Sequence, residues 1–171
     1  MIVLMAGLPG TGKSTLAREL AARLNGSVLS KDEIRHALFS PLDVEYSTEQ
    51  DDFVMDTMLE AAAWILRKDP GRVLFLDGRT FSRRYQVERV LKLAIDLHQP
   101  WQILECICSE ETVRRRIESQ ASAGEHVAGN RTFDLYLDVK ARFEPITFHK
   151  TVIDTELPLA ECVNRALAAL C

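Results

Sequence analysis

Residues 7–14 have the sequence Gly7-Leu8-Pro9-Gly10-Thr11-Gly12-Lys13-Ser14, which follows the spacing Gly-x-x-x-x-Gly-Lys-Ser of a phosphate-binding loop, the Walker A motif. Before it lies an apolar run, residues 2–6, with the length of a buried strand. After it, apolar residues recur at helical spacing as far as residue 24. Strand, glycine-rich turn and helix therefore occur in the order that this motif requires.

The chemistry of the loop follows from its residue types. Its glycines allow the backbone to curl so that successive N–H groups point inward and bind an anion. The helix that opens at Lys13 adds unpaired N–H groups and its positive dipole end. We predict that Lys13 reaches the β- and γ-phosphates of ATP and that the Ser14 hydroxyl ligates Mg²⁺. The predicted nucleotide-binding residues are Gly7, Leu8, Pro9, Gly10, Thr11, Gly12, Lys13, Ser14 and Thr15.

Two other interpretations of this loop are weaker. An ordinary glycine-rich turn does not account for the strand, the spacing, the Lys-Ser pair and the helix together. A dinucleotide-binding fingerprint is suggested by Gly10-x-Gly12, because Asp32 follows about 20 residues later. Thr15, however, stands where the third glycine of that fingerprint belongs, and a lysine directly after Gly12 suits a triphosphate better.

The length and composition indicate one soluble domain spanning residues 1–171. The apolar and charged fractions, 47% and 27%, are those of a globular protein, and no apolar run is long enough to span a membrane. There is no basic leader followed by a cleavage site, so we expect a cytoplasmic protein, either a monomer or a weak dimer. The cysteines show no zinc spacing and are expected to be reduced thiols, mostly buried: Cys106, Cys108, Cys162 and Cys171.

The net charge is small, but the charged residues are distributed unevenly along the chain. A net charge of −4 argues against broad, non-specific binding of nucleic acid. Arginine outnumbers lysine 15 to 6, and 8 of the 15 arginines fall within residues 79–131. Because the arginine fork suits phosphate oxygens, that segment could hold a local anion site, although arginines on solvated helix faces are the simpler explanation for most of them.

Apolar periodicity and turn residues predict alternating strands and helices. Strands are expected at 2–6, 27–29, 73–77, 101–108 and 148–153, and helices at 13–24, 31–38, 48–68, 83–98, 109–119, 132–143 and 158–170. The polar stretch 120–131, with two glycines, is expected to form a lid, at about residues 118–132. The predicted fold is a three-layer αβα P-loop NTPase of the nucleoside- and nucleotide-kinase type, with a mostly parallel five-stranded sheet.

Four polar segments follow the predicted strands. Ligands of such sheets bind at the carboxyl ends of the strands, so these segments should meet at one crevice although they are far apart in the sequence. They are Gly7–Ser14, Ser30–Arg35, Asp77–Thr80 and the residues from Ser109 onward.

Three reactions are compatible with a phosphate-binding loop: hydrolysis as a switch, hydrolysis in a motor, and transfer of a phosphoryl group. A GTP switch needs an Asn-Lys-x-Asp guanine-binding motif, which the sequence lacks. A motor usually needs a further helical domain or partner subunits, for which 171 residues leave little room. Phosphoryl transfer to an acceptor bound opposite the nucleotide is therefore favoured.

Phosphoryl transfer requires a base, metal ligands and cations. Asp32 and Arg35, one turn apart on a helix that follows the second strand, are the candidate base and the candidate ligand of the acceptor or of the moving phosphoryl group. The alternative is that Asp32 caps this helix and Arg35 lies on the surface. Asp77, which ends an apolar strand as in a Walker B motif, is a candidate to hold Mg²⁺ or the acceptor, or else it caps the next turn.

Further candidates surround this predicted centre. Arg79 and Thr80 follow Asp77 and either bind the acceptor or are ordinary loop residues. Arg116 and Arg131 flank the predicted lid, where closure could bring them onto the phosphates and exclude water; a solvated face is the alternative for each. The histidines have no spacing suited to a metal.

With these residues in view, the chain resembles the small P-loop kinases grouped with polynucleotide kinase and adenylylsulfate kinase, in particular the "predicted kinase" branch of AAA-family ATP-binding proteins. The resemblance extends over nearly the whole chain, and the segments that carry it are Gly7–Ser14, Ser30–Arg35, Phe75–Phe81, Cys106–Ile117 and Asn130–Arg131 through Pro145.

The resemblance implies roles for two residues, and the chain differs from the family's pattern at one place. In polynucleotide kinases, an Asp-x-x-Arg after the second strand supplies the general base and an arginine for the acceptor phosphate, which maps onto Asp32 and Arg35. The family's lid helix often reads Arg-Leu-x-x-Arg, whereas this chain has Arg116-Ile117-Glu118-Ser119-Gln120. Because the second arginine is absent, Arg131 becomes the more important lid candidate.

These observations predict an ATP-dependent phosphotransferase that moves the γ-phosphate of ATP to a hydroxyl of a small-molecule acceptor, with Lys13, Asp32, Arg35 and Arg131 as catalytic residues. Ser14 and Asp77 would hold Mg²⁺, and Asp32, Arg35, Asp77, Arg79 and Thr80 would bind the acceptor. One alternative makes the acceptor a nucleic-acid 5′-hydroxyl. Another is a regulatory ATPase that binds a nucleotide and has no acceptor.

Overall fold

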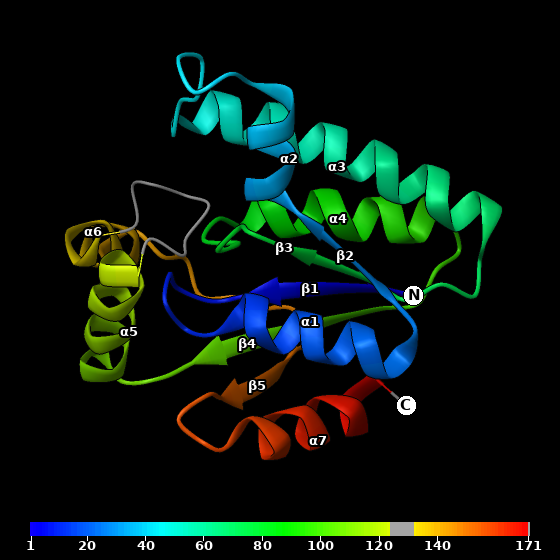
Figure 1. Ribbon diagram of the computed structural model, residues 1–171. Helices are drawn as coiled ribbons and strands as arrows, with labels where there is room; N and C mark the ends of the chain where they lie inside the picture. Colours follow the sequence, from blue (N-terminus) through cyan, green and yellow to red (C-terminus); the bar gives the residue numbers. More distant parts are fainter. Residues whose placement is uncertain (124–131, 171) are drawn as a thin grey trace.

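The computed structural model describes residues 1–123 and 132–170 and shows one parallel sheet of five strands in the order β2-β3-β1-β4-β5 (Figure 1). The strands are β1 (Ile2–Ala6), β2 (Ser27–Ser30), β3 (Leu74–Asp77), β4 (Trp101–Ile107) and β5 (Thr151–Asp154). Every adjacent pair is parallel. This arrangement confirms the predicted fold class.

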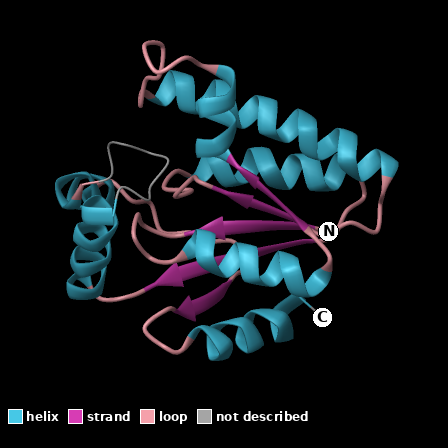
Figure 2. Cartoon of the chain, viewed as in Figure 1, coloured by secondary structure: helices cyan, strands magenta, loops and turns pink. Residues whose placement is uncertain are grey.

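Helices cover both faces of the sheet, giving three layers (Figure 2). Helices α1 and α7 lie on one face, whereas α3 and α4 lie on the other; α2 packs beside α3, and α5 and α6 lie near the carboxyl ends of the strands (Figure 1). The helices described are α1 (Lys13–Leu24), α2 (Lys31–Leu38), α3 (Thr48–Lys68), α4 (Arg84–Asp96), α5 (Glu110–Ala123), α6 (Phe133–Ala141) and α7 (Leu159–Leu170). No helix among the described residues has both the length and the apolar character that a membrane span requires.

The two hydrophobic cores follow from the alternation of side chains along β1, the central strand. Ile2, Leu4 and Ala6 face the core beneath α3 and α4, and Val3 and Met5 face the core beneath α1 and α7. All five side chains are fully buried. A continuous apolar strand is therefore needed at this position, and it fixes where the loop that follows β1 emerges.

The observed element boundaries lie within two residues of the predicted ones except at two places. Helix α5 continues to Ala123, so residues 120–123 are helical where we expected loop. Strand β5 begins at Thr151 instead of Phe148, because its pairing with β4 starts at Thr151 opposite Leu104. The Phe148 side chain instead packs against the core beneath α4. Residues 124–131, which contain most of the predicted lid, lie outside the described residues.

Candidate active site

The loop between β1 and α1 has the backbone that its glycines predict. Gly7, Gly10 and Gly12 have φ angles of 124°, 79° and 84°, which residues other than glycine rarely adopt. Gly7 is also confined by its neighbour, because a Cβ there would lie 2.3 Å from the carbonyl oxygen of Cys106 on β4. No side chain caps the start of α1 at Gly12. The first amides of the helix are thus available to an anion.

Lys13 is folded back over this loop. Its buried ammonium donates hydrogen bonds to the main-chain oxygens of Gly7, at 2.9 Å, and Leu8, at 2.7 Å. The Thr11 hydroxyl donates to the same Leu8 oxygen at 2.8 Å. The ammonium therefore already lies beside the main chain of the phosphate-binding loop. There, phosphate oxygens can replace the main-chain oxygens as its hydrogen-bond acceptors.

Arg116, the predicted lid residue on α5, is held beside the loop. Its Nη2 donates to the Thr155 oxygen at 2.7 Å, and its Nη1 lies 3.1 Å from the Thr155 hydroxyl and 3.5 Å from the Gly10 oxygen. The Thr155 hydroxyl in turn donates to the Thr11 oxygen at 2.9 Å. In this arrangement, Arg116 braces the phosphate-binding loop against α5 and the segment after β5. Arg131, the other predicted lid residue, lies outside the described residues.

The start of α2 leaves Asp32 available for chemistry. Ser30, not Asp32, caps the helix, because the Ser30 hydroxyl accepts from the Glu33 amide at 3.4 Å. Arg35 is 1% exposed and so is not a surface residue. Both features contradict the alternative that Asp32 caps α2 and Arg35 lies on the surface, and they point both side chains into the interior of the site.

Two buried cations flank the Asp32 carboxylate. Its Oδ1 lies 3.7 Å from Lys31 Nζ and 3.5 Å from Arg35 Nη1. Within residues 1–123 and 132–170 the Asp32 carboxylate accepts no hydrogen bond. It is therefore held by charge while its oxygens remain available to accept a proton or a hydrogen bond from a bound molecule.

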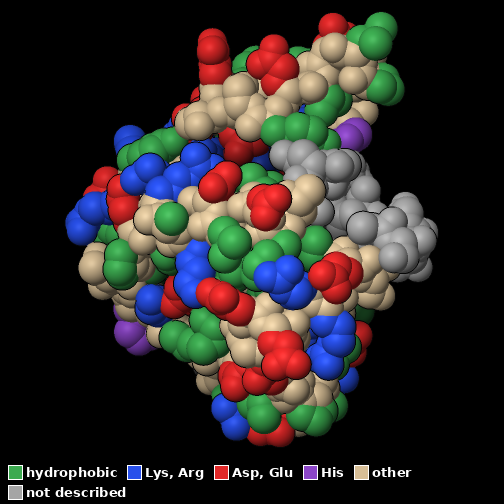
Figure 3. All heavy atoms as spheres, turned by 90° about the vertical axis from the view of Figure 1, so that its left-hand side faces the viewer, with side chains coloured by type: hydrophobic (Ala, Val, Ile, Leu, Met, Phe, Trp, Pro, Cys, Tyr) green, Lys and Arg blue, Asp and Glu red, His purple; other side chains and the backbone are tan. Residues whose placement is uncertain are grey.

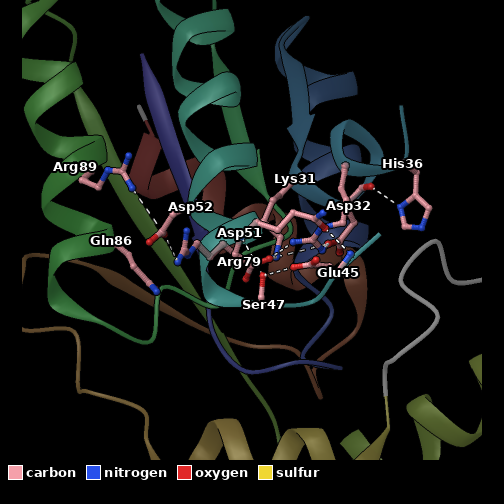
Figure 4. A network of polar contacts seen from close by, with 12 residues as sticks. Lys31, Asp32, His36, Glu45, Ser47, Asp51, Asp52, Arg79, Gln86 and Arg89 are labelled. Carbon is pink, nitrogen blue, oxygen red and sulfur yellow. Dashed lines mark hydrogen bonds and ion pairs between the residues drawn. The ribbon is translucent and has the colours of Figure 1, made fainter. Parts of the chain in front are cut away.

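Asp51, in the first turn of α3, completes this cluster (Figure 4). Its Oδ1 accepts from Lys31 Nζ at 2.7 Å and also pairs with the Arg35 guanidinium. Burial alone would raise the pKa of Asp51, but the charges of Lys31, Arg35 and Arg79 outweigh this effect and hold its pKa below the ordinary value of 3.8. Asp51 is thus ionised at neutral pH.

The carboxyl end of β3 supplies the opposite wall. Asp77 is 3% exposed, and its Oδ1 is buried without a hydrogen-bond partner among the described residues. Arg79 is buried, and its Nη2 lies 2.7 Å from Asp52 Oδ1. The Thr80 oxygen accepts from the Gly7 amide at 3.2 Å, which ties this segment to the phosphate-binding loop. Figure 4 shows Asp52 between Arg79 and Arg89, a residue of α4.

One cavity of about 390 Å³ brings these residues together. It is lined in one part by residues of and beside the phosphate-binding loop, and in a second part by residues from α2, α3 and the segment after β3: the first set is Lys13, Ser14 and Asp77, and the second is Lys31, Asp32, Arg35, Asp51, Arg79 and Thr80. We name this second part the acceptor chamber. Three of the four segments that we expected to meet thus surround one space, whereas Ser109 and Glu110, from the fourth, line a second cavity beside the phosphate-binding loop. Their roles stay predictions.

Sequence reasoning missed Lys31, Asp51, Asp52 and two tyrosines of the chamber wall, Tyr46 and Tyr85. The available signal was the acidic pair Asp51-Asp52 near the start of α3, but acids close to a helix N-terminus are common because they favour the helix dipole. Helix α3 begins with only part of a capping box. Ser47 caps the Gln50 amide, whereas the Gln50 side chain binds the main chain of Asp43 and Glu45.

The cavity also fits a divalent cation that a nucleotide brings with it. Mg²⁺ keeps several waters and needs only one or two protein oxygens beside the phosphates. Ser14 and Asp77 line the same cavity, and the buried Asp77 Oδ1 is an oxygen that needs a partner. The described residues contain no group of three or more His, Cys, Asp and Glu side chains that could form a metal site without a nucleotide.

The fold and the loop define the class of this protein: it has a P-loop kinase fold with a nucleotide-binding loop after the first strand. Residues 2–146 match the AAA domain family, and the chain belongs to that family. No curated protein matches the sequence.

Three solved structures show the same fold. APS kinase CysC from Mycobacterium tuberculosis, in complex with AMPPNP and APS, is 18% identical, with a TM-score of 0.73 over 99% of this chain and 96% of that chain. A gluconokinase from Sinorhizobium meliloti is 17% identical, with a TM-score of 0.69 over 99% and 90%. Chaetomium thermophilum Kti12, in complex with ADP-AlF3, is 15% identical, with a TM-score of 0.67 over 100% of both chains.

Proposed function

We propose that this protein is an ATP-dependent phosphotransferase that moves the γ-phosphate of ATP to a hydroxyl of an acceptor bound in the acceptor chamber. The observation that carries the proposal is the position of Asp32. Its carboxylate lines the same cavity as Lys13 and Ser14, lies between two cations, and accepts no hydrogen bond within the described residues. The likeness to a gluconokinase and to an APS kinase supports the same reaction class.

Asp32 would act as the general base. An acceptor hydroxyl between Asp32 and the γ-phosphate can donate its proton to the carboxylate as its oxygen attacks phosphorus. Ion pairs with Lys31 and Arg35 hold the Asp32 carboxylate in place, and Ser30 removes the competing demand to cap α2. Arg35 would position Asp32, because its guanidinium is buried between Asp32, Asp51 and the Tyr46 ring.

The phosphate end of the cavity would stabilise the transferred charge. The amides of residues 7–14 and the Lys13 ammonium are fixed before the nucleotide arrives, which is the arrangement that lowers the barrier of phosphoryl transfer. Ser14 and Asp77 would hold Mg²⁺, which when bound neutralises developing charge on the phosphate oxygens. Closure of the loop region around Arg131 remains part of the proposal.

The test uses purified protein, Mg²⁺ and ATP labelled at the γ-phosphate, with a broad panel of hydroxyl compounds. We expect label to move to at least one compound. Asp32→Asn should lower the transfer rate by about 10²- to 10⁴-fold while leaving ATP binding intact. Lys13→Ala should abolish both. Glu33→Gln, an exposed neighbour on α2 that pairs with Arg18, is the matched control and should behave as the wild type.

The same panel separates the alternatives. A 5′-hydroxyl oligonucleotide in the panel tests the polynucleotide kinase. Figure 3 faces the edge of the sheet at which the strands end, and there Lys and Arg side chains are interspersed with Asp and Glu instead of forming a continuous basic surface. This mixture disfavours a polyanion. A regulatory ATPase would bind ATP tightly, label no compound and keep its function in Asp32→Asn, and that result would refute the proposal.

A further inference from the structure

We propose that the acceptor chamber takes an uncharged molecule rich in hydroxyl groups and excludes anionic acceptors. This inference rests on the proposed function, because it assigns the chemical class of the acceptor. It is carried by one feature of the chamber: each of its buried cations is already matched to a carboxylate of α3.

Within residues 1–123 and 132–170, the pairing covers the three buried cations of the chamber wall. Lys31, Arg35 and Arg79 are 7%, 1% and 5% exposed. Asp51 pairs with both Lys31 and Arg35, and Asp52 pairs with Arg79 at 2.7 Å. Asp32, which lies 3.7 Å from Lys31 Nζ and 3.5 Å from Arg35 Nη1, is the third carboxylate for these three cations. A buried phosphate or carboxylate group needs unmatched guanidinium or ammonium donors. The chamber offers these cations only with their charge already compensated.

The aspartates of α3 are fixed in place, so an anion cannot easily displace them. Helix α3 is anchored by Met55 and Met58, which are buried in the core against the sheet. Asp52 is held from a second side by Arg89 of α4, at 3.7 Å, and Arg89 also pairs with Asp56 one turn further along α3. An anion entering the chamber would therefore be repelled by the Asp51 carboxylate, which lines the cavity, and could reach Arg79 only in competition with Asp52.

The other charges of the cavity do not change this balance. Arg83, at the rim, pairs with Glu144 at 2.9 Å. Arg142 lines the cavity from α6 but is exposed, so water screens its charge. Lys13 belongs to the phosphate end, where the nucleotide itself would add negative charge next to the chamber.

Hydroxyl groups match what the chamber does offer. A hydroxyl both donates to a carboxylate and accepts from a guanidinium, so a polyol can bind to Asp51 and Arg79, which line the cavity, without breaking an ion pair. Tyr46 and Tyr85, 41% and 39% exposed, supply aromatic surface. Thr48, Ser82 and Gln86 add neutral polar groups to the lining. A sugar or another polyol has this combination of hydroxyls and apolar faces.

The first arm of the test measures binding and does not depend on turnover. Sulfate is titrated calorimetrically into the wild type and into Asp51→Asn, each saturated with Mg²⁺ and a non-hydrolysable ATP analogue that fills the phosphate-binding loop. We expect Asp51→Asn to bind sulfate at least tenfold more tightly, because Lys31 and Arg35 lose their shared carboxylate. Equal sulfate affinity in the two proteins, including no detectable binding by either, would overturn the inference.

Two further variants keep this arm decisive. Asp52→Asn exposes Arg79 in the same way and should also gain sulfate affinity, so it serves if Asp51→Asn fails to fold. Asp56→Asn is the matched control, because Asp56 lies on the same helix and pairs with Arg89 but does not line the cavity. It should bind sulfate as the wild type does. A gain in Asp56→Asn as large as that in Asp51→Asn would show a general charge effect and overturn the inference.

The second arm compares acceptors as matched sets: a hexitol, the corresponding hexonic acid and the hexitol phosphate, each with labelled Mg·ATP. We expect kcat/KM to be at least tenfold larger for the hexitol than for either anion. Equal or faster transfer to an anion would overturn the inference. If no compound of any class accepts label, the proposed phosphotransfer fails, whereas the sulfate comparison still decides whether the chamber excludes anions.

Discussion

The two ends of the cavity handle charge in different ways. At the phosphate end, the main chain of residues 7–14 supplies most of the groups that would bind phosphate, and Lys13 donates to two main-chain oxygens of that loop. In the acceptor chamber, side chains from α2, α3 and the segment after β3 meet, and their buried cations face carboxylates. The first end is built to receive several negative charges, and the second is nearly neutral before anything binds.

This contrast separates a local structure from an assembled one. The loop depends on backbone angles that glycine permits and on the helix that begins directly after it, so eight consecutive residues encode most of its geometry, although Arg116, Thr155 and Thr80 hold it from outside. The chamber depends on segments 20 or more residues apart, since Lys31 of α2 meets Asp51 of α3. Damage to the loop should therefore remove nucleotide binding, whereas damage to the chamber should change acceptor choice and stability.

The largest effect is expected from Gly7→Ala. A Cβ at this φ of 124° is strained, and it would lie 2.3 Å from the main-chain oxygen of Cys106, which β4 cannot move without disturbing its pairing with β1. We expect a loss of about 3 kcal/mol or more in the free energy of unfolding, together with loss of ATP binding. Chemical denaturation and a nucleotide titration measure the two quantities.

Gly71→Ala is the control for this substitution. Gly71 lies in a turn, and a Cβ there would come no closer than 3.5 Å to its nearest neighbour, the Asp69 carboxylate. We expect a change within about 0.5 kcal/mol and unaltered nucleotide binding. Similar losses in both variants would show that the phosphate-binding loop needs glycine no more than an ordinary turn does. The contrast between the loop and the acceptor chamber would then lose its structural basis.

The same contrast explains what could be predicted from the sequence. The Walker A spacing, the apolar strand before it and the alternation of elements fix the fold class and place the loop residues. Asp32, Arg35 and Asp77 could be found because they follow strands, and the strand order then brings them together. Asp51 and Asp52 could not, since acids near the start of a helix have an ordinary local explanation.

An intermediate effect is expected at Arg116, which connects Gly10 of the phosphate-binding loop to Thr155, after β5. Arg116→Ala removes hydrogen bonds to Thr155 and Gly10, so we expect a loss of about 1–2 kcal/mol in the free energy of unfolding and weaker nucleotide binding. Arg116→Lys distinguishes two roles. A lysine keeps the charge but not the fork, so it should rescue little if Arg116 braces the loop.

Arg115→Ala is the matched control, because Arg115 is an exposed neighbour on the same helix. It should change stability and nucleotide affinity little. Substantial rescue of nucleotide affinity by Arg116→Lys would instead support a role of the charge itself on the phosphates, and the brace would then not explain this residue.

The smallest effect is a pH dependence that belongs to the acceptor chamber alone. The pKa of Asp51 lies below its ordinary value of 3.8, because Lys31, Arg35 and Arg79 outweigh the effect of burial. A carboxylate whose pKa is lowered on folding contributes stability that is complete above 3.8 and is lost as the pH falls through its folded-state pKa. The stability difference between the wild type and Asp51→Asn should therefore be constant at neutral and mildly acidic pH and shrink below 3.8.

Denaturation curves over this pH range measure the stability difference. Asp96→Asn, which removes an exposed partner of Lys92, is the control and should change stability by less than about 0.5 kcal/mol. A difference that stays constant into strong acid would mean that Asp51 is not held in its ionised form by these cations, and the charge-compensated chamber would lose its physical basis.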